Sequence, residues 1–128
     1  MSALFDTNDP MKFLYQLSIP SLFLISATFA SAHAFLDYSE PAVGATVSAP
    51  AEVKIWFTEK LHHATSTIQV FDAAGREVDK KDVKFDPKNE LEMGVSLGNL
   101  PPGTYKVVWN AVAIDTHHTH GTFEFTVR

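Results

Sequence analysis

The 128-residue chain contains no cysteine. This absence excludes disulfide scaffolds, zinc sites built from thiolates, thiol catalysis and blue-copper centres, which need a thiolate ligand. Basic residues are also few: 10 Lys and Arg stand against 15 Asp and Glu and give a formal net charge of −5. A nucleic-acid-binding domain normally presents a basic face, and no basic cluster here exceeds Lys80-Lys81. We therefore expect no nucleic-acid partner.

Glycine and proline are slightly sparse, at 6 and 7 residues, and hydrophobic residues make up 45% of the chain, which is typical of a globular protein. The length suffices for one domain and is too short for two ordinary ones. The sequence has no G-x-S-x-G elbow, no H-E-x-x-H and no glycine-rich phosphate loop. These absences favour a small binding domain over an enzyme.

An apolar run near the N-terminus is followed by small residues. Residues 13–25 form the run, and Ala30 and Ala32 then stand in the A-x-A relation that signal peptidase requires. This pattern predicts a cleaved signal peptide over residues 1–32, and Met11 would give it a more typical start than Met1. A membrane anchor is disfavoured because the run is short and interrupted by polar residues.

Cleavage after Ala32 would leave a mature domain of residues 33–128 that begins with His33. No second apolar stretch long enough to span a bilayer follows. We therefore expect an exported protein whose mature form is not embedded in a membrane.

The mature chain alternates apolar and polar residues in several short segments, which is the signature of β-strands. The segments with this pattern are 53–57, 67–71, 91–97, 105–113 and 122–127. Turn sequences such as Asp72-Ala73-Ala74-Gly75 and Pro101-Pro102-Gly103 separate them. No segment shows a convincing helical period. The pattern predicts an all-β fold, an antiparallel Greek-key β-sandwich or small barrel.

The residue that cleavage makes N-terminal could chelate a metal ion. The α-amino group and Nδ1 of His33 can close a six-membered ring on a metal, but only after cleavage, because the amine is an amide until then. A metal must displace the proton of an amine with a pKa of about 8, and Cu²⁺ does so best among the divalent ions. Taken alone, a histidine at this position is more often a chance residue.

A second candidate is the segment D-T-H-H-T-H-G near the C-terminus. If the segment is extended, Asp115 and His117 point one way, and His118 and His120 point the other. A carboxylate and an imidazole added to the two nitrogens of His33 would make a set of three nitrogens and one oxygen, which suits tetragonal Cu²⁺. The alternative is a polar hairpin tip that binds metal adventitiously.

A third candidate is the histidine pair His62-His63. Adjacent residues on a strand point to opposite faces, so at least one of the two is expected to be solvated. Neither is assigned as a ligand.

The mature chain resembles the CopC-type periplasmic copper-binding proteins over essentially all of residues 33–128. The motifs that carry the resemblance are His33-Ala34-Phe35-Leu36, Ser39-Glu40-Pro41-Ala42, the strand ending Phe57-Thr58-Glu59, the turn Leu100-Pro101-Pro102-Gly103-Thr104-Tyr105, and Trp109 followed by D-T-H and G-T-F-E-F. The resemblance implies a cupredoxin-like or immunoglobulin-like β-sandwich. It also implies one Cu²⁺ per chain, bound by His33 (amine and Nδ1), Asp115 and His117.

The function implied by the resemblance is that of a periplasmic Cu²⁺-binding protein that sequesters or carries copper and contributes to copper resistance and homeostasis. Its partners would be the copper ion and a membrane copper transporter or another periplasmic copper protein, and it would not be an enzyme. Some family members also hold Cu⁺ in a methionine-rich loop. The mature chain keeps only Met93, and a single thioether cannot build such a site.

Two alternatives remain open. One is a copper oxygenase with a histidine brace, because the predicted N-terminus also resembles that of the lytic polysaccharide monooxygenases. Such an enzyme needs two opposed histidines and a broad flat surface for its substrate. The other alternative is an exported interaction module without metal, which leaves the coincidence of His33 with the D-x-H motif unexplained.

Overall fold

The computed structural model describes residues 34–128. The predicted signal peptide, residues 1–32, and the predicted ligand His33 lie outside these residues. The strands are β1 (Leu36–Glu40), β2 (Thr46–Val47), β3 (Glu52–Phe57), β4 (Thr67–Phe71), β5 (Lys84–Asp86), β6 (Asn89–Ser96), β7 (Gly103–Val112) and β8 (His118–Val127). Among the described residues, no helix is long and apolar enough to cross a membrane.

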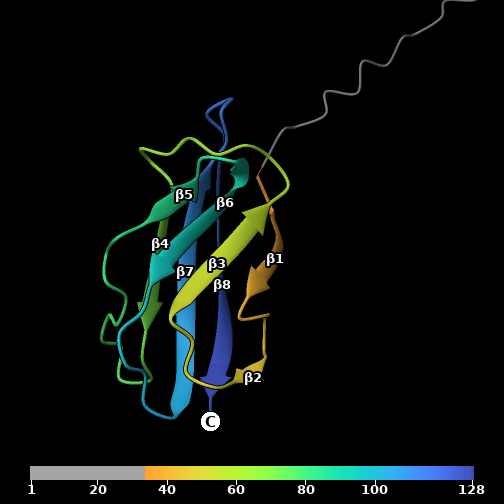
Figure 1. Cartoon of the computed structure of the whole chain (residues 1–128). Coiled ribbons are helices and arrows are strands. Elements are labelled where there is room, and N and C mark those ends of the chain that lie inside the picture. Colours follow the sequence, from red (N-terminus) through yellow and green to blue (C-terminus); the bar gives the residue numbers. More distant parts are fainter. Residues whose placement is uncertain (1–33) are drawn as a thin grey trace, which may run out of the picture.

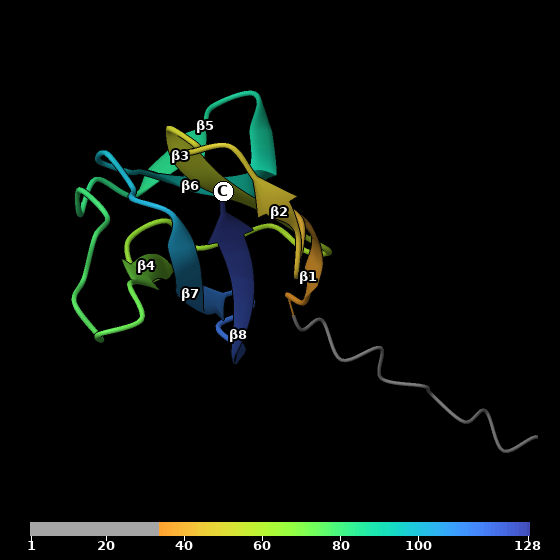
Figure 2. The same ribbon diagram turned by 90° about the horizontal axis from the view of Figure 1, so that it is seen from below.

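Two four-stranded sheets pack face to face, as Figures 1 and 2 show. Their strand orders are β1-β3-β6-β5 and β2-β8-β7-β4. Consecutive strands belong to different sheets except in the hairpins β5–β6 and β7–β8. The predicted all-β sandwich is confirmed. It departs from purely antiparallel pairing at one place, where β2 runs parallel to β8.

The core lies between the sheets and consists of the apolar residues at alternate positions of the strands. The buried members are Val53, Ile55, Phe57, Ile68, Val70, Met93, Val95, Tyr105, Val107, Trp109, Ala111, Phe123, Phe125 and Val127. Trp109 packs edge-on against Phe57, with ring centroids 5.3 Å apart. It also covers Gly121, where an added Cβ would lie 2.6 Å from the indole ring. This position therefore requires glycine.

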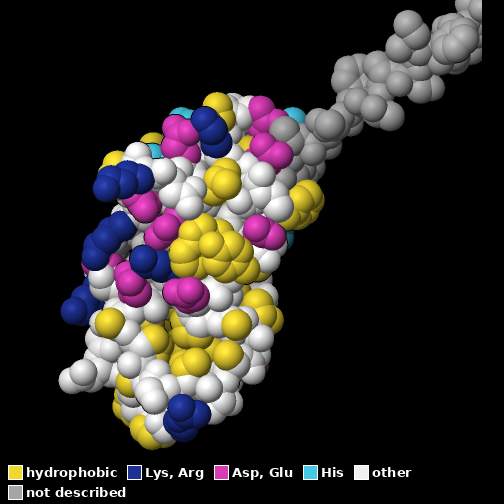
Figure 3. Space-filling model, turned by 45° about the vertical axis from the view of Figure 1, so that its right-hand side comes forward, with side chains coloured by type: hydrophobic (Ala, Val, Ile, Leu, Met, Phe, Trp, Pro, Cys, Tyr) yellow, Lys and Arg dark blue, Asp and Glu magenta, His cyan; other side chains and the backbone are white. Residues whose placement is uncertain are grey.

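The outer face of the first sheet carries a stacked aromatic pair. Tyr38 of β1 and Trp56 of β3 are cross-strand neighbours, and their rings lie parallel with centroids 4.4 Å apart. Hydrophobic side chains form a patch on the face shown in Figure 3, with acidic and basic side chains beside it. Lys54, on the same strand as Trp56, forms ion pairs with Glu52 and Glu92.

Three short strands, β1, β2 and β5, were not predicted from the alternation of apolar and polar residues. β1 buries only Ser39 among its five residues, β2 has two residues and β5 has three. The last strand also begins earlier than expected, at His118 rather than at position 122. The inward positions of this extension are Thr119 and Gly121, which show no apolar pattern, so hydrogen bonding to β7 decides the extent of the strand.

The turn between β7 and β8 lies at one end of the sandwich, at the top in Figure 1. The start of β1, the β3–β4 connection and the β5–β6 turn lie at the same end, whereas the C-terminus lies at the other. The segments that contain the described histidines therefore gather toward this end.

Candidate metal centre

A tight turn joins β7 to β8 and carries the D-T-H motif. The backbone N–H of Thr116 donates to the carbonyl of Ala113 (2.8 Å), and the N–H of Ala113 donates to the carbonyl of His117 (3.0 Å). Thr116 adopts a φ of 74°, the left-handed conformation that closes three-residue hairpin loops. The segment from Asp115 to His117 is therefore a turn, and the expectation of an extended chain was wrong there.

The turn brings the side chains of Asp115 and His117 together. Oδ1 of Asp115 accepts a hydrogen bond from the backbone N–H of His117 (3.2 Å), and Oδ2 lies 2.8 Å from Nδ1 of its imidazole. An ionised carboxylate can only accept, so Nδ1 is the donor, and a neutral imidazole then has its lone pair on Nε2. The two side chains are 37% and 54% exposed. The result is an oxygen donor and a nitrogen donor at the surface.

The chain enters the fold beside this turn. The hydroxyl of Thr119, two residues after His117, donates a hydrogen bond to the carbonyl of Ala34, whose side chain is fully buried. Phe35 follows, and it exchanges hydrogen bonds with Thr58: its N–H donates to Oγ1 (3.0 Å) and its carbonyl accepts from the N–H (2.9 Å). The segment that leads into β1 is thus fixed against the start of β8.

Comparison with known proteins identifies the family. Residues 36–128 match the CopC domain. The chain belongs to the CopC family. A similar protein is the copper transport protein CutJ of Bacillus subtilis, 34% identical over 108 residues, which are 83% of this chain and 20% of CutJ. This chain therefore spans only about a fifth of that relative.

Other relatives match this chain over most of their own length. Copper resistance protein C of Pseudomonas syringae pv. tomato is 37% identical over 113 residues, 82% of this chain and 87% of that protein. The crystal structure of CopC from Methylosinus trichosporium superposes with a TM-score of 0.70 at 30% identity, over 74% of this chain and 93% of that one. The resemblance to CopC proteins seen in the sequence is thereby confirmed.

The other described histidines of this CopC domain are His62 and His63, before β4, and His118 and His120, on β8. His62 and His63 lie in the β3–β4 connection rather than within a strand. Nδ1 of His62 lies 3.1 Å from the hydroxyl of Thr65, and the ring of His63 stacks on Phe85 with centroids 4.1 Å apart. The two adjacent imidazoles thus have separate local roles.

His118 and His120 lie on β8 itself and are exposed. They pair in register with Val112 and Asn110, on the face opposite to Thr119 and its bond with Ala34. The expectation that these two imidazoles share a face agrees with this register. Among residues 34–128, no three His, Asp or Glu side chains are arranged to hold a metal ion.

The single methionine of the described domain is not placed for copper. Met93 points between the sheets and is fully buried. It packs among apolar core residues such as Ile55, its partner in register on β3. Its thioether is thus a core side chain.

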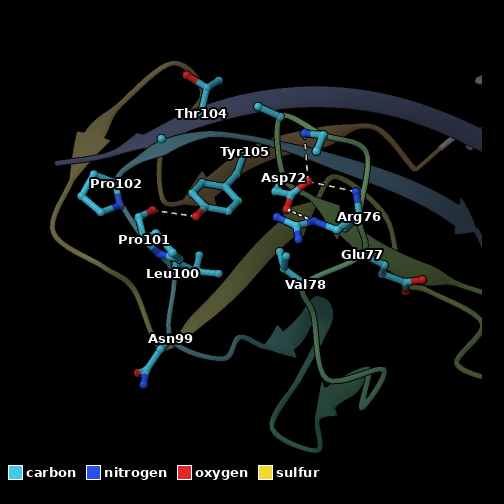
Figure 4. Close-up of a pocket in the computed structure, with 13 residues that line it drawn as sticks. Asp72, Arg76, Glu77, Val78, Asn99, Leu100, Pro101, Pro102, Thr104 and Tyr105 are labelled. Atoms are coloured by element: carbon cyan, nitrogen blue, oxygen red, sulfur yellow. Dashed lines mark hydrogen bonds and ion pairs between the residues drawn. The ribbon is translucent and has the colours of Figure 1, made fainter.

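A hollow at the other end of the sandwich has no reactive group (Figure 4). It lies between the β4–β5 and β6–β7 connections. Its polar groups bond within these loops: Asp72 accepts from Arg76 and from the N–H of Ala74, and the Tyr105 hydroxyl donates to the carbonyl of Pro101 (2.6 Å). The N–H of Arg76, above all, lowers the pKa of Asp72, so this carboxyl stays ionised and is no proton donor at neutral pH.

The structure adds two residues that sequence reasoning missed. Thr119 and Ala34 are 85 positions apart, and nothing in the local pattern links them. One signal was available in the sequence. Residues two positions apart on a strand lie on the same face, so Thr119 was expected on the face of His117. Its hydroxyl could therefore have been considered as a hydrogen-bond donor beside the D-T-H motif.

Proposed function

We propose that this chain binds one Cu²⁺ ion through the amine and Nδ1 of His33, the carboxylate of Asp115 and the imidazole of His117. The protein sequesters or carries copper in the periplasm and contributes to copper resistance. The observation that carries the proposal is the Asp115–His117 pair, held beside Ala34 in a fold of the CopC family. The names of the copper resistance and copper transport relatives support the choice of metal.

The position of Ala34 supports the role of His33. One peptide bond joins the two residues, and consecutive Cα atoms are about 3.8 Å apart. The bond between Thr119 and Ala34 therefore holds the residue that follows His33 in the chain at the start of β8. The amine becomes a ligand only when signal peptidase has removed residues 1–32, which couples copper binding to export.

The donor set determines the oxidation state. An amine, two imidazoles and a carboxylate are hard to borderline ligands and favour Cu²⁺ over Cu⁺, which prefers sulfur. Met93 cannot supply a thioether without leaving the core. Copper release is therefore promoted by reduction to Cu⁺.

Exposure of the pair suits a carrier. With 37% of the Asp115 side chain and 54% of the His117 side chain exposed, a membrane copper transporter or another periplasmic copper protein can exchange the ion by direct contact. A carrier needs no substrate cavity, and the hollow of Figure 4 lies at the opposite end of the sandwich. We propose no catalytic role.

The test compares the exported protein that begins with His33 and a form with one glycine before it, in competition titrations for Cu²⁺. The extension converts the amine to an amide, and we expect the affinity to fall by at least ~10³-fold, about 1.4 kcal/mol per decade. Asp115→Ala and His117→Ala should also weaken binding, whereas His63→Ala should not. Equal affinities of the mature and extended forms would refute the chelate.

A further inference from the structure

Two histidines of β8 are not used by the proposed copper site. His118 and His120 are the first and third residues of the strand, and both are exposed. Side chains two positions apart on a strand lie on one face. Thr119, between them, points the other way and bonds to Ala34. The two imidazoles therefore share the outer face of the sheet, opposite the proposed site.

The backbone under this pair is fixed. β8 pairs with β7 from Val112↔His118 to Gly103↔Val127 without interruption. At a rise of about 3.4 Å per residue, the Cα atoms of His118 and His120 are ~6.8 Å apart. Two imidazoles at this spacing can converge on one ion at metal–nitrogen distances of about 2.0–2.1 Å. Because the strand is already ordered, only side-chain rotations are lost on binding.

The surroundings of the pair admit a cation. Its partners in register on β7, Val112 and Asn110, carry no charge. The amide of Asn110 donates from Nδ2 to the hydroxyl of Thr67 (3.4 Å), a contact between two neutral side chains. The chain as a whole has a net charge of −5. No lysine or arginine stands in register beside the two imidazoles to repel a metal ion.

We propose that His118 and His120 form an accessory Cu²⁺ site in which each imidazole supplies one nitrogen and water completes the coordination. Imidazole nitrogen suits late first-row divalent ions, and Cu²⁺ stands at the top of their affinity order. Since no third His, Asp or Glu of residues 34–128 joins the pair, the site binds more weakly than the four-donor set and exchanges its ion readily. It shares no residue with the four-donor set. A substitution that abolishes copper binding at one site should therefore leave binding at the other.

The test adds Cu²⁺ alone to the protein in two steps. Equilibrium dialysis and electron paramagnetic resonance follow a first and a second equivalent. We expect the second equivalent to bind with a nitrogen-rich spectrum. His118→Thr and His120→Thr keep a strand-forming residue and should each weaken the second step about tenfold or more.

His63→Thr is the matched control, because it removes one imidazole outside both sites. It should leave the second step unchanged, and thermal midpoints show whether each variant is folded. The second site should still bind Cu²⁺ in Asp115→Ala, because Asp115 belongs only to the first site. This variant therefore distinguishes an error in the accessory site from an error in the proposed function. Absence of a second bound equivalent, a second step unchanged in His118→Thr and His120→Thr, or an equal loss in His63→Thr would each overturn the proposal.

Discussion

The hydrogen bond between Thr119 and Ala34 makes a prediction about copper affinity that involves no ligand. Thr119→Val removes the hydroxyl while it preserves the shape and the strand preference of the side chain. A hydrogen bond contributes about 1 kcal/mol net. If ordering of the segment before β1 must precede copper binding, that loss corresponds to about a fivefold weaker Cu²⁺ affinity, at 1.4 kcal/mol per decade. The bonds between Phe35 and Thr58 remain, which keeps the loss well below that of a ligand.

The assay is competition for the first equivalent of Cu²⁺ against a chromophoric chelator. Thr119→Ser keeps the donor and should bind like the parent protein. Thr122→Val makes the same substitution on the same strand at an exposed position, so it should also leave the affinity unchanged. Parental affinity in Thr119→Val, or an equal loss in Thr122→Val, would show that this bond does not position the proposed copper site.

Three further predictions concern the scaffold. Gly121→Ala forces a Cβ into Trp109 and should lower the free energy of unfolding by about 1–3 kcal/mol, measured by urea denaturation; an unchanged midpoint would contradict the packing. Thr116→Asn places a residue that tolerates the left-handed region at φ 74° and should raise the melting temperature by about 4–8 °C for each 1 kcal/mol of strain relieved, whereas a drop would show that the threonine is not strained. The N–H of Ser96, above all, lowers the pKa of Asp82 to about 2, so its stabilisation is present above the ordinary pKa of about 4 and is lost as the pH falls toward 2; Asp82→Asn should flatten the dependence of stability on pH in that window, and an unchanged slope would argue against it.

The parts of the fold that were predictable are those where burial alternates. In β7, Tyr105, Val107, Trp109 and Ala111 all point into the core, and the sequence pattern alone shows this strand. β1 could not be found in this way, because Ser39 is its one buried residue and its pairing with β3 depends on backbone hydrogen bonds.

Asp115 and His117 lie close together, as expected, but the cause differs from the one that the sequence suggested. The prediction assumed an extended strand, whereas a left-handed residue, Thr116, turns the chain and the Asp115 carboxylate caps the turn. The alternation of side chains along a strand carries no information about a residue with positive φ. Only a glycine or an asparagine would have indicated one in the sequence, and position 116 is a threonine. The alternation could have drawn attention to Thr119, but not to Ala34 as its partner, because that contact depends on how the two sheets pack.

The direction of β8 has a consequence for how the domain can be attached to something else. The strand runs its ten residues from the D-T-H turn to the far end of the sandwich, about 30 Å at 3.4 Å per residue. An affinity tag, a fluorescent protein or a linker to a solid support joined after Arg128 would therefore leave the molecule at the end opposite to the proposed copper ligands. A protein immobilised by that end would expose the D-T-H turn to the solution, so attachment after Arg128 suits a surface-based sensor that tests the proposed copper site.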